Sequence, residues 1–493
     1  MKDFAISIVR TLRDEGHQAY LVGGCVRDLL LGRDPADYDV ATDATPQRVM
    51  RIFPDTYAVG AQFGVVLVPV PKELRTPKLE VDPGNDLQPS DPCHSAPVSG
   101  DGAAFDTLMG KHGGPGHSHK ACVEVATFRS DIGYSDGRHP DEVRFSRDPR
   151  EDVQRRDFTI NGLLLDPEKN EVLDFVGGQE DLRTGIIRAI GEPERRFTED
   201  KLRMLRAIRF AARFQYRIDP ATFAAIQKLA RQIHQVSRER VRDELTRMLT
   251  EGHAKRAFEL LDQSRLLREV LPEIDAMKGV EQPPEFHPEG DVFVHTLLLL
   301  ENLPHPCTPT LAWGALLHDV GKPPTFRRAP DRIRFDNHVA VGVKMAEAIC
   351  KRLRFSNDDT EQILALVDNH MRFGDVRRMK LSTFKKFIRL PQFDEHLELH
   401  RLDCESSHRS LAMYNFTREQ MANLPAEEVR PKPLMNGGDL IAAGYAPGPL
   451  FKEILTAVED AQLDGRLASR EEALRFVQEL FPLKSGSVAR QTM

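Results

Sequence analysis

The spacing of apolar residues along the chain changes from a mixed pattern near the start to a helical one later. Phe4, Ile8 and Leu12 lie at helical spacing, which predicts a helix over 2–16. Short apolar runs and turn residues then predict strand 19–22, helix 26–31, strand 38–41, helix 46–53, strand 65–70 and strand 122–128. An alternation of short strands and helices is typical of a compact unit with a sheet and covering helices.

Residues 71–120 interrupt this unit with a different composition. They contain seven Pro and seven Gly among 50 residues, a share typical of disordered segments. The sequence therefore predicts a disordered insertion over 71–120, between two strands of the first unit.

From about Glu194 onward, helical spacing dominates. It predicts helices over 199–215, 220–235, 237–251 and 253–263, then a second helical block over 287–407 and a helical tail from 434. Pro283 and Pro284 mark a linker between the two blocks. The predicted fold class is α+β, with a mixed-sheet head followed by all-α regions.

Composition limits the class of protein. Hydrophobic residues make up 40% of the chain, and no apolar run reaches the length of a membrane span. The N-terminus lacks a signal peptide, and the six cysteines form no Cys-x-x-Cys pair. We therefore expect a cytoplasmic enzyme with reduced thiols and no membrane association.

The net charge is −7, but residues 188–256 carry 17 Lys/Arg against 9 Asp/Glu, which is compatible with RNA binding there.

The first candidate chemistry is the carboxylate pair Asp37 and Asp39. On a strand, residues at i and i+2 point to the same face. Two carboxylates that point together repel each other unless a cation lies between them, and hard oxygen ligands favour Mg²⁺ or Mn²⁺. Two such ions can hold the attacking and leaving oxygens of a phosphoryl transfer. Alone, the Asp-x-Asp pattern is more often a polar turn.

A glycine turn upstream strengthens this interpretation. Gly23 and Gly24 lie between a predicted strand and a predicted helix, where backbone N–H groups can approach phosphate oxygens. Arg27 follows and can donate paired hydrogen bonds to a triphosphate. A glycine pair is also common in simple tight turns.

Three motifs together resemble a known family. They are LVGGCVRDLLLGRDPADYDVAT at 21–42, RRDFTIN at 155–161 and EDKLRMLRAIRF at 199–210. Their order and spacing are similar to those of bacterial class II tRNA nucleotidyltransferases and poly(A) polymerases, members of the DNA polymerase β nucleotidyltransferase superfamily. The resemblance implies a polymerase-β-like head domain and transfer of nucleotides to RNA 3′ ends.

The resemblance also implies roles for individual residues. Asp37 and Asp39 would hold the metal and be catalytic, and the nucleotide would be bound by Gly23, Gly24, Arg27, Asp28, Arg156, Asp200, Arg203, Arg206 and Arg209. On a helix, Asp200 and Arg203 would be neighbours and could present an acceptor beside a donor fork to the base. A third catalytic carboxylate could be Glu124 or Asp157, and the sequence does not choose between them.

A second set of candidate ligands lies further along. His295, the pair His318-Asp319, and Asp403 resemble the ligand set of the HD phosphohydrolase superfamily; His338 and His370 lie between them. The resemblance implies a divalent transition metal and hydrolysis of phosphate esters. The alternative is an inherited helical scaffold that binds tRNA without hydrolysis.

The implied organisation has four parts: a nucleotidyltransferase head over 1–160, a neck that binds RNA and selects nucleotides over 161–280, an HD-like domain over 281–410, and a helical tail over 411–493.

The implied function is template-independent CCA addition to tRNA from CTP and ATP. One alternative is a poly(A) polymerase, disfavoured because residues 59–63 lack a basic pair. Another is an HD phosphohydrolase with a silent head. Whether C, A or both are added stays open, although residues 131–146 could form a loop that switches between them.

Overall fold

The computed structural model describes residues 1–58, 64–71, 122–132, 142–285 and 287–483. The predicted insertion, the 59–63 stretch and most of the 131–146 loop therefore lie outside the described residues. The chain forms two compact units. Unit 1 comprises Met1–Asp275, Pro304–Cys307 and Arg352–Arg354, and unit 2 comprises the remainder from Ala276.

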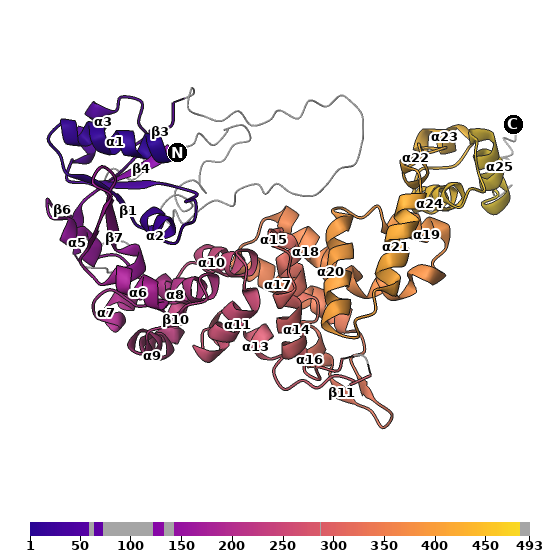
Figure 1. Cartoon of the computed structure of the whole chain (residues 1–493). Helices are drawn as coiled ribbons and strands as arrows, with labels where there is room; N and C mark the ends of the chain where they lie inside the picture. The colour runs from indigo at the N-terminus through magenta and orange to yellow at the C-terminus, as the bar shows by residue number, and fades with distance from the viewer. Residues whose placement is uncertain (59–63, 72–121, 133–141, 286, 484–493) are drawn as a thin grey trace, which may run out of the picture. The chain divides into compact units, whose positions relative to one another are not determined.

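Unit 1 begins with a sheet of six strands in the order β3-β4-β2-β1-β7-β8 (Figure 1). The strands are β1 (Ala19–Val22), β2 (Asp39–Thr42), β3 (Val65–Pro69), β4 (Cys122–Thr127), β7 (Leu163–Asp166) and β8 (Glu171–Asp174). β2 and β4 are parallel, and the other neighbours are antiparallel. The strands predicted over 19–22, 65–70 and 122–128 are confirmed to within one residue. The mixed sheet also confirms the predicted α+β class.

Helices cover this sheet because their apolar residues share one face. In α1 (Lys2–Asp14), the buried residues Ala5, Ile8, Val9 and Leu12 follow helical spacing. The next two helices are α2 (Gly24–Leu30) and α3 (Pro46–Ile52). Proline stands in the first turn of α3, where its missing N–H has no intrahelical partner to lose.

The rest of unit 1 is mostly helical, and one helix begins later than predicted. The helix predicted over 199–215 is α8 (Leu202–Arg213), and a separate helix, α7 (Pro193–Glu199), ends where the predicted one begins. Asp200 lies between them in an extended conformation, with φ −143° and ψ 107°. Its side chain accepts a hydrogen bond from the backbone N–H of Leu202 at 3.0 Å, and this local contact accompanies the break between the two helices.

The neck continues with α9 (Pro220–Leu229), α10 (Arg238–Thr250) and α11 (Ala254–Gln263). These helices confirm the periodicity predicted for 220–263. Nine residues of α8 are buried, and α8 packs against both α10 and α11. Packing against α10 and α11 therefore fixes the position of α8 within the neck.

Unit 2 is built from helices, with one short hairpin of β11 (Arg327–Arg328) and β12 (Ile333–Arg334). The helices that matter for the site are α14 (Val292–Glu301), α15 (Pro309–Leu317), α17 (His338–Leu353), α18 (Asn357–Asn369), the 3₁₀ segment η5 (His370–Arg378) and α20 (Phe393–Ser406). Helix α15 is buried almost throughout, including Trp313, so it forms the centre of this unit. The C-terminal helices are α21 (Ala412–Asn423), α23 (Gly437–Ala442), α24 (Pro449–Leu463) and α25 (Arg470–Leu480).

Among the described residues, no helix has both the length and the apolar character needed to cross a membrane.

Two glycines allow a close backbone contact in unit 2. A Cβ atom on Gly321 would lie 2.1 Å from the carbonyl oxygen of His338 and 2.6 Å from the backbone nitrogen of Gly342. Gly321 follows the His318-Asp319 pair, and His338 begins α17. The absence of a side chain at Gly321 therefore lets α17 approach the turn that carries this pair.

We expect Gly321→Ala to lower the free energy of unfolding of unit 2 by about 1–3 kcal/mol, because the added methyl group overlaps backbone atoms. Gly374→Ala is the matched control, since a Cβ there would have no atom within 4 Å. Thermal and urea unfolding of both variants measure the difference. Equal stability of the two variants would contradict the proposed close contact.

Candidate functional site

The glycine turn predicted from the sequence lies at the end of β1. Gly23 has φ +77°, which favours glycine, and its N–H donates to the carbonyl of Leu163 at 3.1 Å. A Cβ on Gly23 would lie 3.2 Å from Nη1 of Arg156 and 4.0 Å from Oδ2 of Asp39. The glycine therefore keeps the space between a guanidinium and a carboxylate open for a ligand.

Arg27 is buried beside this turn, with 1% of its surface exposed. Its Nε donates to Asp28 at 2.8 Å, and its Nη1 donates to Oδ1 of Asn161 at 2.7 Å. The guanidinium also lies 4.7 Å from the ring centre of Phe214. Because these contacts fix the side chain, Arg27 presents a preorganised positive charge to the cleft.

The two predicted catalytic aspartates differ in their setting. Asp39 is the first residue of β2 and is half-buried, whereas Asp37 is exposed and precedes the strand. The expectation that both lie on one strand is therefore wrong, since only Asp39 is in the sheet. Glu124 on β4 pairs with Asp39 across the parallel register. Burial raises the pKa of Glu124, and the charge of Asp37 adds to this increase.

Asp157, the other candidate for a third carboxylate, is already engaged by protein groups. Arg206 donates to its Oδ2 at 2.9 Å, while the backbone of Phe158 and the side chain of Asn161 donate to its Oδ1. Burial would raise the pKa of Asp157, but Arg206 and Asn161 hold it below its usual value. This carboxylate orients two residues of the cleft.

One cleft brings most of the predicted nucleotide-binding residues together. Its lining includes Gly23, Gly24, Arg27, Asp39, Arg156, Asp200, Arg203 and Arg206, and also Arg155, Asp157, Asn161 and Arg240. The residues come from the glycine turn and α2, from the start of β2, from the segment 155–161, and from α8 and α10. The cleft therefore combines the Asp39 carboxylate with a strongly basic wall.

The expected side-by-side pair of Asp200 and Arg203 has a different arrangement. Asp200 accepts from Arg240 of α10, with Nη2 to Oδ2 at 2.8 Å. Arg203 instead donates to Glu199 at 3.0 Å and to the backbone carbonyl of Arg155 at 3.1 Å. Each side chain is thus oriented by a separate partner. Arg240 belongs to no motif that we identified, and only the packing of α10 against α8 brings it here.

Three predicted residues are not among those that line the cleft, namely Asp37 of the carboxylate pair and two of the nucleotide-binding set. Arg209 is 1% exposed and forms ion pairs with Glu244 at 2.8 Å and Glu251 at 3.2 Å. Asp28 accepts a hydrogen bond from Nε of Arg27. Both support the cleft from within the protein.

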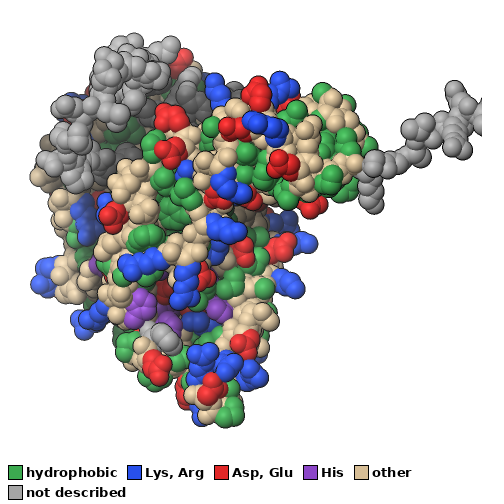
Figure 2. All heavy atoms as spheres, turned by 90° about the vertical axis from the view of Figure 1, so that its right-hand side faces the viewer, with side chains coloured by type: hydrophobic (Ala, Val, Ile, Leu, Met, Phe, Trp, Pro, Cys, Tyr) green, Lys and Arg blue, Asp and Glu red, His purple; other side chains and the backbone are tan. Residues whose placement is uncertain are grey.

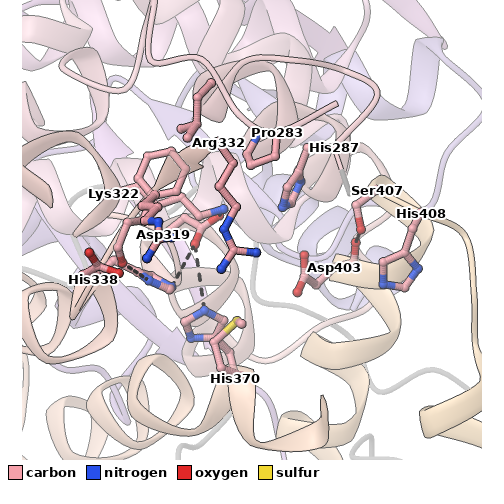
Figure 3. A pocket seen from close by; sticks show the side chains of 15 residues that line it. Pro283, His287, Asp319, Lys322, Arg332, His338, His370, Asp403, Ser407 and His408 are labelled. Carbon is pink, nitrogen blue, oxygen red and sulfur yellow. Dashed lines mark hydrogen bonds and ion pairs between the residues drawn. The ribbon is translucent and has the colours of Figure 1, made fainter. Parts of the chain in front are cut away.

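Unit 2 gathers the second predicted set around the buried carboxylate of Asp319. Nε2 of His318 lies 3.1 Å from its Oδ2, and Nε2 of His295 lies 3.9 Å from the same oxygen and 3.1 Å from Asp403. The four predicted ligands therefore meet. The structure adds His338 and His370, whose Nε2 atoms lie 3.9 and 3.8 Å from Oδ1 of Asp319 (Figure 3).

Electrostatics at this cluster favour a cation. Burial alone would raise the pKa of Asp319, but His318 and Lys322 hold it well below its usual range. Burial would lower the pKa of His295, yet its contacts with Asp403 and Glu289 raise it to about 9. Burial lowers the pKa of His370 to about 4. His370 is therefore a neutral imidazole, the state in which a histidine binds a metal, whereas His295 would release its proton when a metal binds.

The cluster borders an open pocket whose lining includes His287, Lys322, Arg332, Arg334 and Met371. Figure 2 shows histidine side chains reaching the surface together, beside Lys and Arg side chains. The lining carries Lys322, Arg332 and Arg334 together with Asp319, Asp336 and Asp403, so cationic groups for an anionic ligand lie beside carboxylates that suit a metal.

Comparison with known proteins agrees with the architecture. Residues 19–89 and 105–188 match the family model "Poly A polymerase head domain". Residues 215–278 match "Probable RNA and SrmB- binding site of polymerase A", and residues 338–477 match a model of tRNA nucleotidyltransferase domain 2. The fold and the cleft thus define a nucleotidyltransferase with a polymerase-type head.

Similar proteins identify the family within this class of nucleotidyltransferases. The CCA-adding enzyme of Geobacillus sp. (strain WCH70) is 30% identical over 473 residues, which is 95% of each chain. The CCA-adding enzyme of Leuconostoc mesenteroides subsp. mesenteroides is 28% identical and covers 96% of this chain and 95% of its own. The chain belongs to the family of CCA-adding enzymes.

Solved structures extend the comparison. The Bacillus stearothermophilus CCA-adding enzyme in complex with CTP has a TM-score of 0.66 and 27% identity, and the match covers 97% of this chain and 96% of that one. The Thermotoga maritima CCA-adding enzyme complexed with tRNA has a TM-score of 0.52 and 18% identity, covering 97% and 95%, and it supports the fold alone.

Proposed function

We propose that this enzyme adds C and A to the 3′ end of tRNA, transferring CMP and AMP from CTP and ATP with release of pyrophosphate. The observation that carries the proposal is the single cleft that joins the glycine turn, Asp39 and the Asp200–Arg203 region. The family membership and the match to a CTP complex support it. A poly(A) polymerase is the alternative outcome of the assay below.

Carboxylate oxygens at Asp37 and Asp39 suit Mg²⁺ or Mn²⁺, and Glu124 is the third carboxylate that we assign to this edge of the sheet. Such a cation, when bound, neutralises charge on the phosphates and lowers the pKa of the attacking hydroxyl. We choose Glu124 over Asp157 because Asp157 is occupied by Arg206 and Asn161.

The protein's own residues bind and orient the triphosphate. Gly24 begins α2, where the partial positive charge of the helix favours an anion, while the N–H of Gly23 is held by the carbonyl of Leu163. Arg27 and Arg156 add guanidinium donors from two sides of the cleft. These groups align the nucleotide so that the RNA 3′-hydroxyl attacks the α-phosphate while pyrophosphate leaves.

Base selection without a template requires protein groups that match the edge of the base. Cytosine and adenine both offer an exocyclic amino donor, which a carboxylate such as Asp200 can accept. Arg203 supplies donors for the neighbouring ring nitrogen. Arg240 donates a hydrogen bond to Oδ2 of Asp200 and so fixes this carboxylate. We therefore assign Arg240 as a positioning residue for base selection.

The proposal predicts that the wild-type enzyme extends a tRNA transcript lacking CCA by C, C and A in order and then stops. Asp39→Asn should lower the rate by at least about 1,000-fold, because loss of a metal ligand removes several kcal/mol of transition-state stabilisation. Asp55→Asn, an exposed aspartate of the same unit, is the control and should extend normally. Long A tails would instead indicate a poly(A) polymerase, and wild-type activity of Asp39→Asn would refute the site.

Arg240→Ala should reduce discrimination against UTP and GTP by about 10-fold, because a lost charged hydrogen bond of roughly 1.5 kcal/mol frees the Asp200 carboxylate. Arg238→Ala removes the same charge from the same helix and serves as the control. The readout is the ratio of kcat/KM for CTP and UTP, together with the Kd for tRNA. Weaker tRNA binding with an unchanged nucleotide ratio would mean that Arg240 contacts RNA instead.

We also propose a second activity, hydrolysis of phosphate esters at a divalent transition metal held by His295, His318, Asp319 and Asp403. The supporting observation is that the four side chains meet, that Asp319 and Asp403 line an adjoining pocket, and that Nε2 of His318 is buried without a hydrogen-bond partner among the described residues. Nitrogen and carboxylate ligands of this kind suit Mn²⁺, Co²⁺, Ni²⁺ or Zn²⁺.

His318→Ala should lower hydrolysis of p-nitrophenyl phosphate in the presence of Mn²⁺ by at least about 100-fold, since it removes a metal ligand. The same variant should still add CCA, whereas Asp39→Asn should still hydrolyse. A wild-type enzyme that hydrolyses nothing with any of these metals would leave unit 2 as a scaffold.

A further inference from the structure

Asn161 ends the 3₁₀ segment η3 (Thr159–Asn161) and contacts charged groups on two sides. Its Oδ1 accepts a hydrogen bond from Nη1 of Arg27 at 2.7 Å, and its Nδ2 donates to Oδ1 of Asp157 at 3.1 Å. Only 7% of the residue is exposed, so these contacts are shielded from water. A guanidinium has only donors and an ionised carboxylate has only acceptors, so an amide, which has both, can bridge them.

Asp157 extends this bridge to the helix that carries the proposed base-selecting residues. Its other oxygen, Oδ2, accepts a hydrogen bond from Nε of Arg206 at 2.9 Å and lies 2.8 Å from Nη2 of the same guanidinium. Arg206 stands on α8, three residues after Arg203. Side-chain hydrogen bonds therefore join α2 to α8 in the order Arg27, Asn161, Asp157 and Arg206.

The two arginines at the ends of this chain of contacts also face the same aromatic ring. The guanidinium carbon of Arg27 lies 5.4 Å from the ring centre of Phe210, and that of Arg206 lies 5.3 Å from it. Phe210 is a buried residue of α8. The hydrogen bonds and the ring thus form a closed loop, so a displacement of one arginine would disturb the other.

The two ends of the loop serve different parts of the nucleotide in the mechanism proposed above. Arg27 binds the triphosphate, whereas Arg206 shares α8 with Arg203, which we assign to the base. The ribose sets the separation of base and triphosphate within one nucleotide. An enzyme that selects the base without a template must therefore hold its two binding groups at a matching separation.

We propose that Asn161 is a positioning residue that couples the binding of the triphosphate at Arg27 to the selection of the base on α8. This inference rests on the proposed nucleotidyl transfer and deepens it. The effect of Asn161 on the base passes through Asp157 and Arg206, and not through contact with the base itself.

Two measurements on Asn161→Ala test the two sides of this bridge in the full-length enzyme. Pyrophosphate carries no base, so its inhibition constant against CTP reports the triphosphate side alone. We expect this constant to rise by about 10-fold, because Arg27 loses a charged hydrogen bond. The ratio of kcat/KM for CTP and UTP reports the base side, and we expect it to fall by about 10-fold, since Arg206 loses its fixed position.

A double-mutant cycle tests the route of the coupling. Arg206→Ala removes the far end of the chain of contacts, so adding Asn161→Ala should not lower the CTP/UTP ratio any further. A ratio that falls by the product of the two single effects would mean that Asn161 acts on the base independently, and would overturn the coupling.

Thr159→Val is the matched control, because Thr159 lies in the same 3₁₀ segment, is buried, and donates a hydrogen bond to Oδ2 of Asp181 at 2.7 Å. It is not among the residues that line the cleft. This variant should lose stability in thermal unfolding but keep the wild-type pyrophosphate inhibition and CTP/UTP ratio. Should Asn161→Ala fail to fold, Asn161→Ser retains a small polar side chain and carries the same expectations.

The outcomes separate this inference from the function on which it rests. A wild-type enzyme that incorporates no CMP would overturn the proposed function and the coupling together. Normal incorporation by the wild type, with pyrophosphate inhibition and CTP/UTP ratio both unchanged in the Asn161 variant, would overturn the coupling alone. A loss of kcat/KM that is equal for all nucleotides would show a purely structural role and would also overturn it.

Discussion

The antiparallel pairing of β1 with β2 is the interaction on which the catalytic cleft depends. It places Val22 opposite Asp39, so the glycine turn that follows β1 lies beside the carboxylate that begins β2. The parallel pairing of β2 with β4 then sets Glu124 beside the same aspartate. Because side chains alternate along a strand, a shift of one residue in either pairing would turn a carboxylate to the opposite face. Backbone hydrogen bonds thus determine where the acidic chemistry is located.

Charge burial imposes a related constraint in both units. Arg27 is almost completely buried and is matched by Asp28 and by the side-chain oxygen of Asn161. Asp319 is buried in the second unit, among imidazoles and one lysine. An unpaired charge in the protein interior is costly, so each such group requires a shell of partners in fixed positions. The same shells preorganise the groups that we assign to ligand binding.

Much of the architecture followed from the sequence because apolar spacing reports which face of an element is buried. That information predicted β1, β3, β4 and the helices of the neck. It did not predict the break at Asp200, because the hydrogen bond from the Leu202 N–H to the Asp200 side chain is a local backbone contact that leaves the apolar spacing unchanged. It also missed Arg240, His338 and His370 as site residues, since their positions depend on packing between distant segments. The motif likewise did not distinguish Arg209, which is buried in ion pairs, from the arginines that line the cleft.

One feature of the sheet bears on how this protein tolerates change in length. The antiparallel pair β3 and β4 begins with Pro69 opposite Cys122, so the chain leaves the sheet and returns to it at neighbouring positions. The entropy of closing a loop rises only slowly with its length. The register that brings Glu124 to Asp39 therefore depends only weakly on the number of residues between these strand ends. We expect this junction to accept sequences of different length, including an inserted domain, with little effect on the pairing of β2 with β4.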